Sequence, residues 1–451
     1  MSRRDFFRAC AALAALPWTA SAQTARRLRA APAQVHLVGS AHPQTAVWSY
    51  DGTVPGPQLR FRQGERLRIE VENQLPEATT VHWHGIRLPN AMDGVAGVTQ
   101  PPIAAAGGRF TYEFVLPDAG TYWYHPHFAS PGQVGRGLYG ALIVDEPEPP
   151  AVDRDVIWVL SDWRLDRNAR IVGDFGSFMD ASHAGRIGNT VTVNGVIQES
   201  FELRAGERVR LRLINAANAR IFGLDFRGHE PLVIALDGHP VTPHRADRIV
   251  LGPSMRADLL LDATAEPGSV HQVIDDFYQR RAYRLLDLRY AATKTPGRAG
   301  APLPRLAPNP VAEPDLAKAE RHRVRFEGGM MGRMPMREMR HGMAWMVNGR
   351  PIAEHDHGEP LFTLAHGRSH LIEMVNDTSW HHPIHLHGHV FRLLTMNGKP
   401  VQHRPLLDTV LLDPDSRAEI AFVADNPGDW MFHCHVLEHQ ASGLMALIRV
   451  A

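Results

Sequence analysis

The sequence carries the pattern Gly64-Glu65-Arg66-Leu67-Arg68-Ile69, which runs on to Asn73, and it repeats this pattern twice more. The other copies are Gly206-Glu207-Arg208-Val209-Arg210-Leu211, running to Asn215, and Gly367-Arg368-Ser369-His370-Leu371-Ile372, running to Asn376. The spacing from glycine to asparagine is identical in all three. Alternating apolar and polar residues after a turn glycine are typical of half-buried strands. The repeats therefore predict an all-β chain of three related β-sandwich domains.

The length of the chain agrees with this division. A chain of 451 residues is too long for one hydrophobic core, because cores stop growing at about 250–300 residues. The stretch 293–314 is rich in proline and alanine, as linkers are, and the prolines of 147–150 close the first domain. We predict domains at 23–148, 149–292 and 315–451, with a linker at 293–314.

Charge excludes two classes of partner. The 48 basic residues balance the 48 acidic residues, so the chain has no net attraction to nucleic acid or to an anionic membrane surface. No apolar run reaches the roughly 20 residues that a membrane-spanning helix needs. We expect neither a nucleic-acid partner nor membrane insertion.

The N-terminus has the features of an export signal. Ser2-Arg3-Arg4-Asp5-Phe6-Phe7 precedes an apolar stretch from Ala9 to Leu16, and Ala20-Ser21-Ala22 follows as a cleavage site. This order predicts a twin-arginine signal at 1–22, and therefore a periplasmic protein that the twin-arginine machinery exports in the folded state.

Only one cysteine lies beyond this signal. Cys10 falls within the signal, so Cys434 is the single thiol of the mature chain and no intramolecular disulfide can form. An unpaired thiol in an oxidising compartment is a candidate metal ligand or reactive group.

Histidine pairs recur in register with the three repeats. At the same distance beyond each asparagine lie His82-Trp83-His84, Leu224-Asp225-Phe226 and His385-Leu386-His387, so the second domain lacks the pair. Two further pairs, His125-Pro126-His127 and His433-Cys434-His435, follow Gly120 and Gly428 at equal spacing. Side chains alternate along a strand, so each pair presents two imidazoles on one face. Four imidazoles from each of domains 1 and 3 predict a metal cluster where these domains meet.

The cysteine narrows the choice of metal. Imidazole alone suits copper, zinc, iron and nickel, but His382, Cys434 and His439 form the two-histidine, one-thiolate set of a blue copper site. Because Cys434 lies between His433 and His435, its thiolate can hold one ion on one strand face while its neighbours bind the cluster on the other. This order provides a covalent path for an electron between the two sites.

These segments resemble the four copper motifs of the multicopper oxidases, which include laccases, ascorbate oxidase and bacterial cuprous oxidases. The resemblance covers nearly the whole mature chain and implies cupredoxin-like Greek-key domains and four copper ions. It implies that a type 1 copper takes single electrons from phenolic or aromatic donors or from Cu(I), and that a three-copper cluster reduces dioxygen to water. It places the type 2 copper on His82 and His385. It places the type 3 pair on His84, His125, His127, His387, His433 and His435, and the type 1 copper on His382, Cys434 and His439.

Two positions refine the resemblance. Many bacterial members have an axial methionine five residues after the last type 1 histidine, where this chain has Leu444, which cannot coordinate, followed by Met445. Loss of a thioether ligand is expected to raise the type 1 reduction potential. Asp93 occupies the place of an acid beside the type 2 site, where it would relay protons to dioxygen, whereas Gln440 replaces a glutamate of the relatives and cannot ionise. The alternatives are a bulge that brings Met445 in and an ordinary Asp93-Gly94 turn.

Methionines crowd the segment before the third domain. They are Met330, Met331, Met334, Met336, Met339, Met343 and Met346, with His341 among them. Thioethers prefer Cu(I), so the segment is a candidate site for cuprous substrate, as in the copper-tolerance oxidases that it resembles. A short helix packed on the core, or a lid that restricts bulky phenols, would give the same composition.

Two other functions share this fold. A copper nitrite reductase has no use for eight cluster histidines. A non-catalytic periplasmic copper-binding or assembly protein would not need the complete ligand set. We therefore favour an enzyme whose partners are dioxygen and a small-molecule or metal-ion donor, and we expect a monomer, as for most three-domain relatives.

Overall fold

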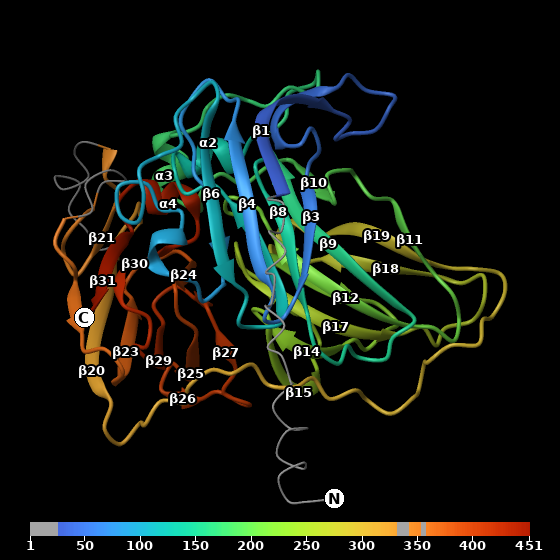
Figure 1. Ribbon diagram of the computed structural model, residues 1–451. Helices are drawn as coiled ribbons and strands as arrows, with labels where there is room; N and C mark the ends of the chain where they lie inside the picture. Colours follow the sequence, from blue (N-terminus) through green and yellow to red (C-terminus); the bar gives the residue numbers. More distant parts are fainter. Residues whose placement is uncertain (1–25, 332–341, 353–357) are drawn as a thin grey trace, which may run out of the picture.

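The computed structural model describes residues 26–331, 342–352 and 358–451, and strands dominate it (Figure 1). They form six sheets in three consecutive pairs, which we call domains 1, 2 and 3. The predicted signal at 1–22, with Cys10, lies outside the described residues. No helix in the described part of the chain is long and apolar enough to cross a membrane.

Domain 1 pairs the sheet β2-β1-β4-β6 with the sheet β3-β8-β7-β5. Its elements are β1 (Arg26–Val35), β2 (Thr45–Tyr50), β3 (Gly56–Arg62), β4 (Arg66–Asn73), β5 (His82–His84), η1 (Asn90–Met92), β6 (Gly108–Val115), β7 (Gly120–His125), α2 (Ser130–Val134) and β8 (Gly140–Asp145).

Domain 2 pairs the sheet β10-β9-β12-β17-β14-β15 with the sheet β11-β19-β18-β13-β16. Its elements are β9 (Arg154–Trp163), α3 (Phe178–Ser182), β10 (Thr190–Val193), β11 (Ser200–Leu203), β12 (Arg208–Asn215), β13 (Phe222–Phe226), β14 (Leu232–Leu236), β15 (His239–Arg245), β16 (Ile249–Leu251), β17 (Arg256–Asp262), β18 (Val270–Asp275), η2 (Gln279–Arg281) and β19 (Tyr283–Tyr290).

Domain 3 pairs the sheet β21-β20-β23-β29-β25-β26, in which β27 also joins β25, with the sheet β22-β31-β30-β24-β28. Its elements are β20 (Glu320–Gly328), β21 (Trp345–Val347), β22 (Phe362–Leu364), β23 (Ser369–Asn376), β24 (His382–Leu386), β25 (Phe391–Met396), β26 (Lys399–Pro400), β27 (Leu406–Leu407), β28 (Thr409–Leu412), β29 (Arg417–Val423), β30 (Gly428–Cys434), α4 (Leu437–Ala441) and β31 (Met445–Val450).

The three repeated stretches are strands in equivalent places, which confirms the predicted fold class. β4, β12 and β23 each pair in parallel with the first strand of their domain and antiparallel with a later strand. The shared asparagine ends each strand and organises the same turn. Asn73, Asn215 and Asn376 each donate from the side-chain amide to carbonyls of the following loop and accept the amide N–H two residues on. The asparagine is repeated because it satisfies the polar backbone groups of this buried turn.

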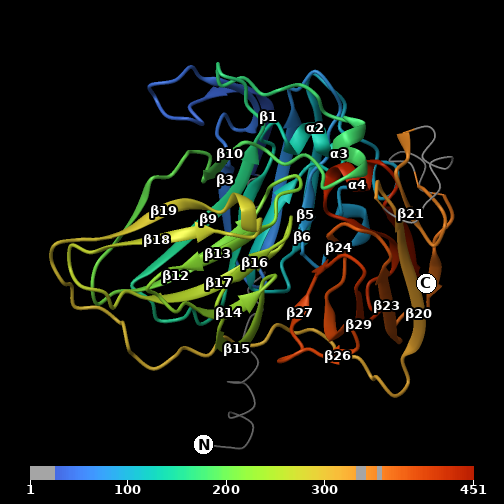
Figure 2. The same ribbon diagram turned by 180° about the vertical axis from the view of Figure 1, so that it is seen from behind.

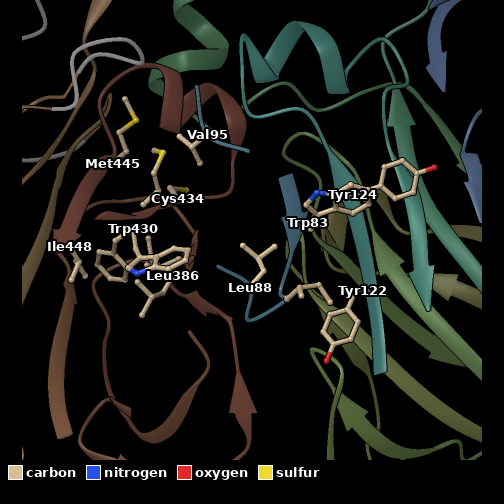
Figure 3. Close-up of a cluster of buried hydrophobic side chains, with 14 of the residues drawn as sticks. Trp83, Leu88, Val95, Tyr122, Tyr124, Leu386, Trp430, Cys434, Met445 and Ile448 are labelled. Atoms are coloured by element: carbon tan, nitrogen blue, oxygen red, sulfur yellow. The ribbon is translucent and has the colours of Figure 1, made fainter. Parts of the chain in front are cut away.

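Domains 1 and 3 share one hydrophobic core, whereas domain 2 has its own. Figure 3 shows this shared core passing from Ile448, Trp430 and Leu386 of domain 3 to Trp83 and Tyr122 of domain 1. A continuous apolar interface fixes the two domains against each other, and this rigidity is what a metal cluster between them requires. The reverse view in Figure 2 shows domain 2 beside domain 1.

The short helices of the three domains meet at one point. α2, α3 and α4, one from each domain, lie together in both views (Figures 1 and 2). The buried Glu438 of α4 binds domain 2 here: its carboxylate accepts hydrogen bonds from the side chain of Asn218 at 2.9 Å and from the backbone N–H of Arg186 at 3.1 Å. Domain 2 is thereby fastened to the end of domain 3 that carries His439.

Candidate metal centres

Eight histidines converge at the contact between domains 1 and 3. Strand pairing brings them together in two halves, because β5 pairs with β7, opposing His82 to His125, and β24 pairs with β30, opposing His385 to His433. The members of this cluster are His82, His84, His125, His127, His385, His387, His433 and His435, and all are buried. The structure therefore brings together every cluster histidine that the sequence singled out.

Hydrogen bonds fix the direction of most of these rings. Five histidines donate from Nδ1, at 2.8–3.0 Å, to an oxygen outside the cluster, which leaves Nε2 as the inward nitrogen. These are His82, His125, His385, His387 and His433. His84 is reversed: its Nε2 donates to Asp408 Oδ1 at 3.1 Å, which turns Nδ1 toward the cluster. A second hydrogen bond of this kind sets the tautomer of a metal-binding histidine.

The inward nitrogens have the properties of metal ligands. His387 and His433 approach to 3.0 Å between their Nε2 atoms, His127 and His433 to 3.5 Å, and His125 and His435 to 3.4 Å. His82 Nε2, His385 Nε2 and His84 Nδ1 are buried without a hydrogen-bond partner.

The electrostatics of the cluster favour the neutral, ligating form of its rings. Burial lowers the pKa of most of these imidazoles well below the ordinary value, and neighbouring imidazoles lower it further; these are His84, His125, His387, His433 and His435. Buried, unprotonated and unpartnered nitrogens that face one another fit metal cations, and imidazole suits copper.

A second, smaller group of ligands lies next to the cluster. His382 Nδ1, Cys434 Sγ and His439 Nδ1 form a triangle with sides of 3.4, 3.7 and 3.2 Å. A trigonal ion at the roughly 2.0–2.3 Å usual for nitrogen and sulfur ligands requires a triangle with sides of about 3.5–4 Å. The group therefore fits the predicted type 1 copper.

The surroundings of this triangle are closed and apolar. All three ligands are buried, and burial raises the pKa of the Cys434 thiol well above its ordinary value. The ring of Trp345 packs on both histidines, with centroids 4.9 Å from His382 and 4.4 Å from His439. His439 Nε2 donates to the backbone carbonyl of His183 at 2.6 Å, so domain 2 covers this site. Sequence reasoning missed His183 because a carbonyl contact leaves no trace in residue identity.

Strand register shows which of the two predicted axial candidates, Leu444 or Met445, lies on the strand face of Cys434. Leu444 is buried, and its carbonyl accepts the N–H of Cys434 at 3.0 Å, while the next residue, Met445, pairs with His433. Opposite residues of an antiparallel pair share a face. Leu444 therefore shares the face of Cys434, and Met445 shares the face of His433. Of the two candidates, Leu444 is therefore the one on the same strand face as the Cys434 thiol.

Two aspartates, one from domain 1 and one from domain 3, make hydrogen bonds to the cluster histidines. The Asp93 carbonyl accepts His82 Nδ1–H at 2.8 Å, and its Oδ2 accepts His387 Nδ1–H at 2.8 Å. Asp408 mirrors this arrangement with the domains exchanged: its carbonyl accepts from His385 at 2.8 Å and its Oδ1 from His84 at 3.1 Å. Each acid thus ties a proposed type 2 ligand of its own domain to a proposed type 3 ligand of the other.

The two acids differ in their other contacts. Asp93 Oδ1 is buried without a hydrogen-bond partner, whereas Asp408 is paired with Arg256 of domain 2. Burial alone would raise the pKa of Asp408, but the charge of Arg256 and the contact with His84 outweigh it and hold this pKa well below the ordinary value. Asp93 was predicted as a site residue. Asp408 was not, because its distance along the chain from the histidine pairs has no counterpart in domain 1. The predicted non-ionising Gln440 is buried on α4 beside His439.

The methionine segment is only partly described. Met334, Met336, Met339 and His341 lie outside the described residues. Met331 is 81% exposed, and Met330 joins the type 1 region through its backbone, whose carbonyl accepts Trp380 Nε1–H at 2.7 Å. Met346 lies in strand β21, and Met343 is half-buried. None of the four described methionines is fully buried.

Comparison with known proteins gives a consistent answer. Three multicopper oxidase family models match residues 33–149, 154–282 and 329–451. The multicopper oxidase MmcO of Mycobacterium tuberculosis is 32% identical over 96% of this chain and 88% of its own length. A copper resistance protein A homolog of Pseudomonas syringae is 26% identical over 92% of this chain and 90% of its own length. A crystal structure of a multi-copper oxidase from Pseudomonas thermotolerans superposes with a TM-score of 0.85 at 39% identity, over 94% of this chain and 98% of that one.

The chain belongs to the multicopper oxidase family. It is accordingly an oxidoreductase with copper cofactors, built from cupredoxin-like β-sandwich domains, and the predicted family, fold class and enzyme class are confirmed.

Proposed function

We propose that this oxidase holds four copper ions and couples one-electron oxidation of a donor to the reduction of dioxygen to water. His382, Cys434 and His439 would hold the type 1 ion, and His82 and His385 the type 2 ion. The remaining cluster histidines would hold the type 3 pair: His84, His125, His127, His387, His433 and His435. The observation that carries this proposal is the strand end His433-Cys434-His435, whose cysteine lies in one ligand group and whose histidines lie in the other.

The residues of the chain would link the two copper sites, exclude water from the type 1 ligands and deliver protons. When bound, the copper ions supply the one-electron and dioxygen chemistry. Cys434 is joined covalently to both flanking histidines, and His433 Nδ1 also donates to the Cys434 carbonyl at 2.9 Å. The buried Cys434 is shielded from side reactions with water. Asp93 has one carboxylate oxygen, Oδ1, that makes no hydrogen bond, and its other oxygen contacts His387, so we assign it the proton transfer that dioxygen reduction requires.

The donor class depends on the methionine segment. We propose that Met330, Met331, Met334, Met336, Met339 and Met343 gather Cu(I) near His382 and His439, because thioethers prefer cuprous ions and Met331 is open to solvent. Phenolic and aromatic donors remain the alternative substrates at the same type 1 site.

Oxygen uptake by the copper-loaded protein separates these donors. Replacing Met331, Met334, Met336 and Met339 with leucine preserves apolar bulk while removing the thioethers, and it spares Trp345, which packs on the type 1 histidines. We expect Cu(I) oxidation to fall while oxidation of a phenol holds or rises. Met396→Leu, in strand β25, serves as the matched control. Equal Cu(I) oxidation in all three proteins would leave a laccase-like oxidase whose methionine segment is structural.

We also propose that residues 1–22 direct export to the periplasm by the twin-arginine route, and that the mature chain works as a monomer. A fusion of this segment to a reporter should lose export when Arg3 and Arg4 are both replaced with lysine. Light scattering of the copper-loaded protein should give the mass of one chain.

A further inference from the structure

A buried arginine of domain 2 reaches the cluster although that domain carries none of its ligands. Arg256 opens strand β17 and is fully buried. Its guanidinium binds Asp408 with both ends of its fork, Nη1 to Oδ1 at 2.9 Å and Nη2 to Oδ2 at 2.5 Å. Such a bidentate pair fixes both the position and the rotation of the carboxylate.

The guanidinium has no unused donor. Nε donates to the Thr121 carbonyl of domain 1 at 3.2 Å, and the remaining Nη1 and Nη2 protons go to the carbonyls of Ser254 at 3.1 Å and Asp237 at 3.0 Å. With the two bonds to Asp408, all five N–H groups of Arg256 are satisfied. Arg256 therefore joins the three domains at a single point.

Asp408, held by Arg256, in turn binds His84. Its Oδ1 accepts from His84 Nε2, and Thr409 Oγ1 adds a hydrogen bond to the same oxygen at 2.8 Å. His84 is the ring whose inward nitrogen is Nδ1, in contrast to the five rings that present Nε2. Asp408 Oδ1 is the nearer of the two oxygens beside His84 Nε2, since Thr409 Oγ1 lies at 3.4 Å. A carboxylate in this place sets the tautomer and the orientation of a metal-binding histidine.

The packing next to His84 leaves no room for adjustment. Gly85 has φ +83°, and a Cβ at this position would lie 2.5 Å from both Arg256 Nη2 and Asp408 Oδ2. The glycine that ends the His82-Trp83-His84 segment is thus required by the ion pair that rests against it. The backbone of the ligand strand and the ion pair form one close-packed unit.

We propose that Arg256 is a positioning residue of the copper cluster, acting through Asp408 to set which nitrogen of His84 faces the copper. This inference rests on the proposed cluster assignment. It gives domain 2 a role in assembling a centre to which it contributes no ligand. It also distinguishes the two aspartates of the cluster, since among the described residues Asp408 is paired with an arginine and Asp93 is not.

Copper retention by paired variants tests this role. Arg256→Gln removes the fork, and Arg212→Gln is the matched control. Arg212 is equally buried in domain 2 and paired with Asp155 and Asp258, but it touches no cluster residue. We expect both variants to have a lower Tm. Only Arg256→Gln should release cluster copper to a chelator, with about 10–100-fold weaker retention. Its blue type 1 band should persist.

Each other outcome has a definite meaning. If Arg256→Gln and Arg212→Gln retain cluster copper equally, the positioning role is wrong while the proposed function stands. If the parent protein shows no type 2 signal when loaded, the proposed function itself fails.

Two milder variants test the proposal if Arg256→Gln does not fold. Arg256→Lys keeps the charge but lacks the planar fork, and Asp408→Asn removes the charge while keeping an acceptor. Both should weaken cluster copper without affecting the blue band, and unchanged copper retention in both would overturn the proposal. The pair Arg256→Gln with Asp408→Asn should be no worse than either single change, because the two act as a unit.

Discussion

The two candidate copper sites differ in how many domains build them. The proposed type 1 ligands all come from domain 3, between His382 and His439, and domain 2 adds only a carbonyl contact from His183. The cluster takes four histidines from each of domains 1 and 3 and is held by aspartates from both. The type 1 site is thus a property of one domain, whereas the cluster exists only when domains 1 and 3 dock. Changes at each site should therefore have separable effects.

The sharpest separation is expected at Cys434. Cys434→Ser removes the thiolate, so the blue absorption should vanish and donor oxidation should fall to background. The eight cluster histidines keep all their contacts, so the type 2 resonance and the cluster copper should remain. Absorption, electron paramagnetic resonance and oxygen uptake measure these effects. A surviving blue band would refute the type 1 assignment, and loss of cluster copper would show that the two sites are not independent.

A proton-transfer defect should be confined to the cluster. Asp93→Asn keeps a hydrogen-bond acceptor for His387 but cannot carry a proton, so oxygen reduction should slow by about 10²–10⁴-fold. Reduction of the type 1 site by a donor should be unaffected, because Asp93 does not contact its ligands. Stopped-flow reduction under anaerobic conditions, followed by mixing with oxygen, measures the two halves separately. Asp93→Glu should recover part of the rate, and equal oxygen reduction in Asp93→Asn would exclude the assigned role.

The protonation of the ligand side chains before copper binds should also distinguish the two sites. Burial raises the pKa of Cys434, so its thiol is protonated at neutral pH and must release one proton when the type 1 site binds copper. Burial lowers the pKa of His439 to about 3 and those of five cluster histidines well below 6.5, so these rings are already neutral and release none. Between pH 6 and 8, copper affinity should rise about tenfold per pH unit at the type 1 site.

Calorimetry in two buffers of different ionisation enthalpy counts these protons. Cys434→Ser should abolish the release that accompanies type 1 loading. A proton count well above one, arising from cluster loading, would mean that the histidines are protonated in the folded apoprotein.

The sequence predicted the ligands better than their supports. Strand alternation and the repeat were sufficient to place His82, His84, His385 and His387 in one cluster, because period and spacing are local properties. Asp408 and Arg256 were missed because their roles depend on contacts between residues 152 positions apart along the chain. The domain boundaries and the 293–314 linker remain predictions. Domain 2 is a second example. Its strands β13 and β18 occupy the places of the histidine-bearing strands. The sequence showed that these strands lack the histidine pairs, but it did not predict the contact of Arg256 with Asp408.

The smallest expected effect is a change in the type 1 reduction potential caused by substitution of Leu444. Leu444 shares the strand face of Cys434 and offers no donor atom, so Leu444→Met would add a weak thioether to the type 1 ligands. This ligand should lower the reduction potential by a tenfold change in the reduction equilibrium, which is about 59 mV for one electron. Redox titration of the blue band measures the shift, with Met445→Leu as the control on the opposite face. A shift in potential caused by Met445→Leu alone would show that the chain bulges at this point and that Met445 is the axial residue. A shift confined to Leu444→Met would establish the strand register at the type 1 site.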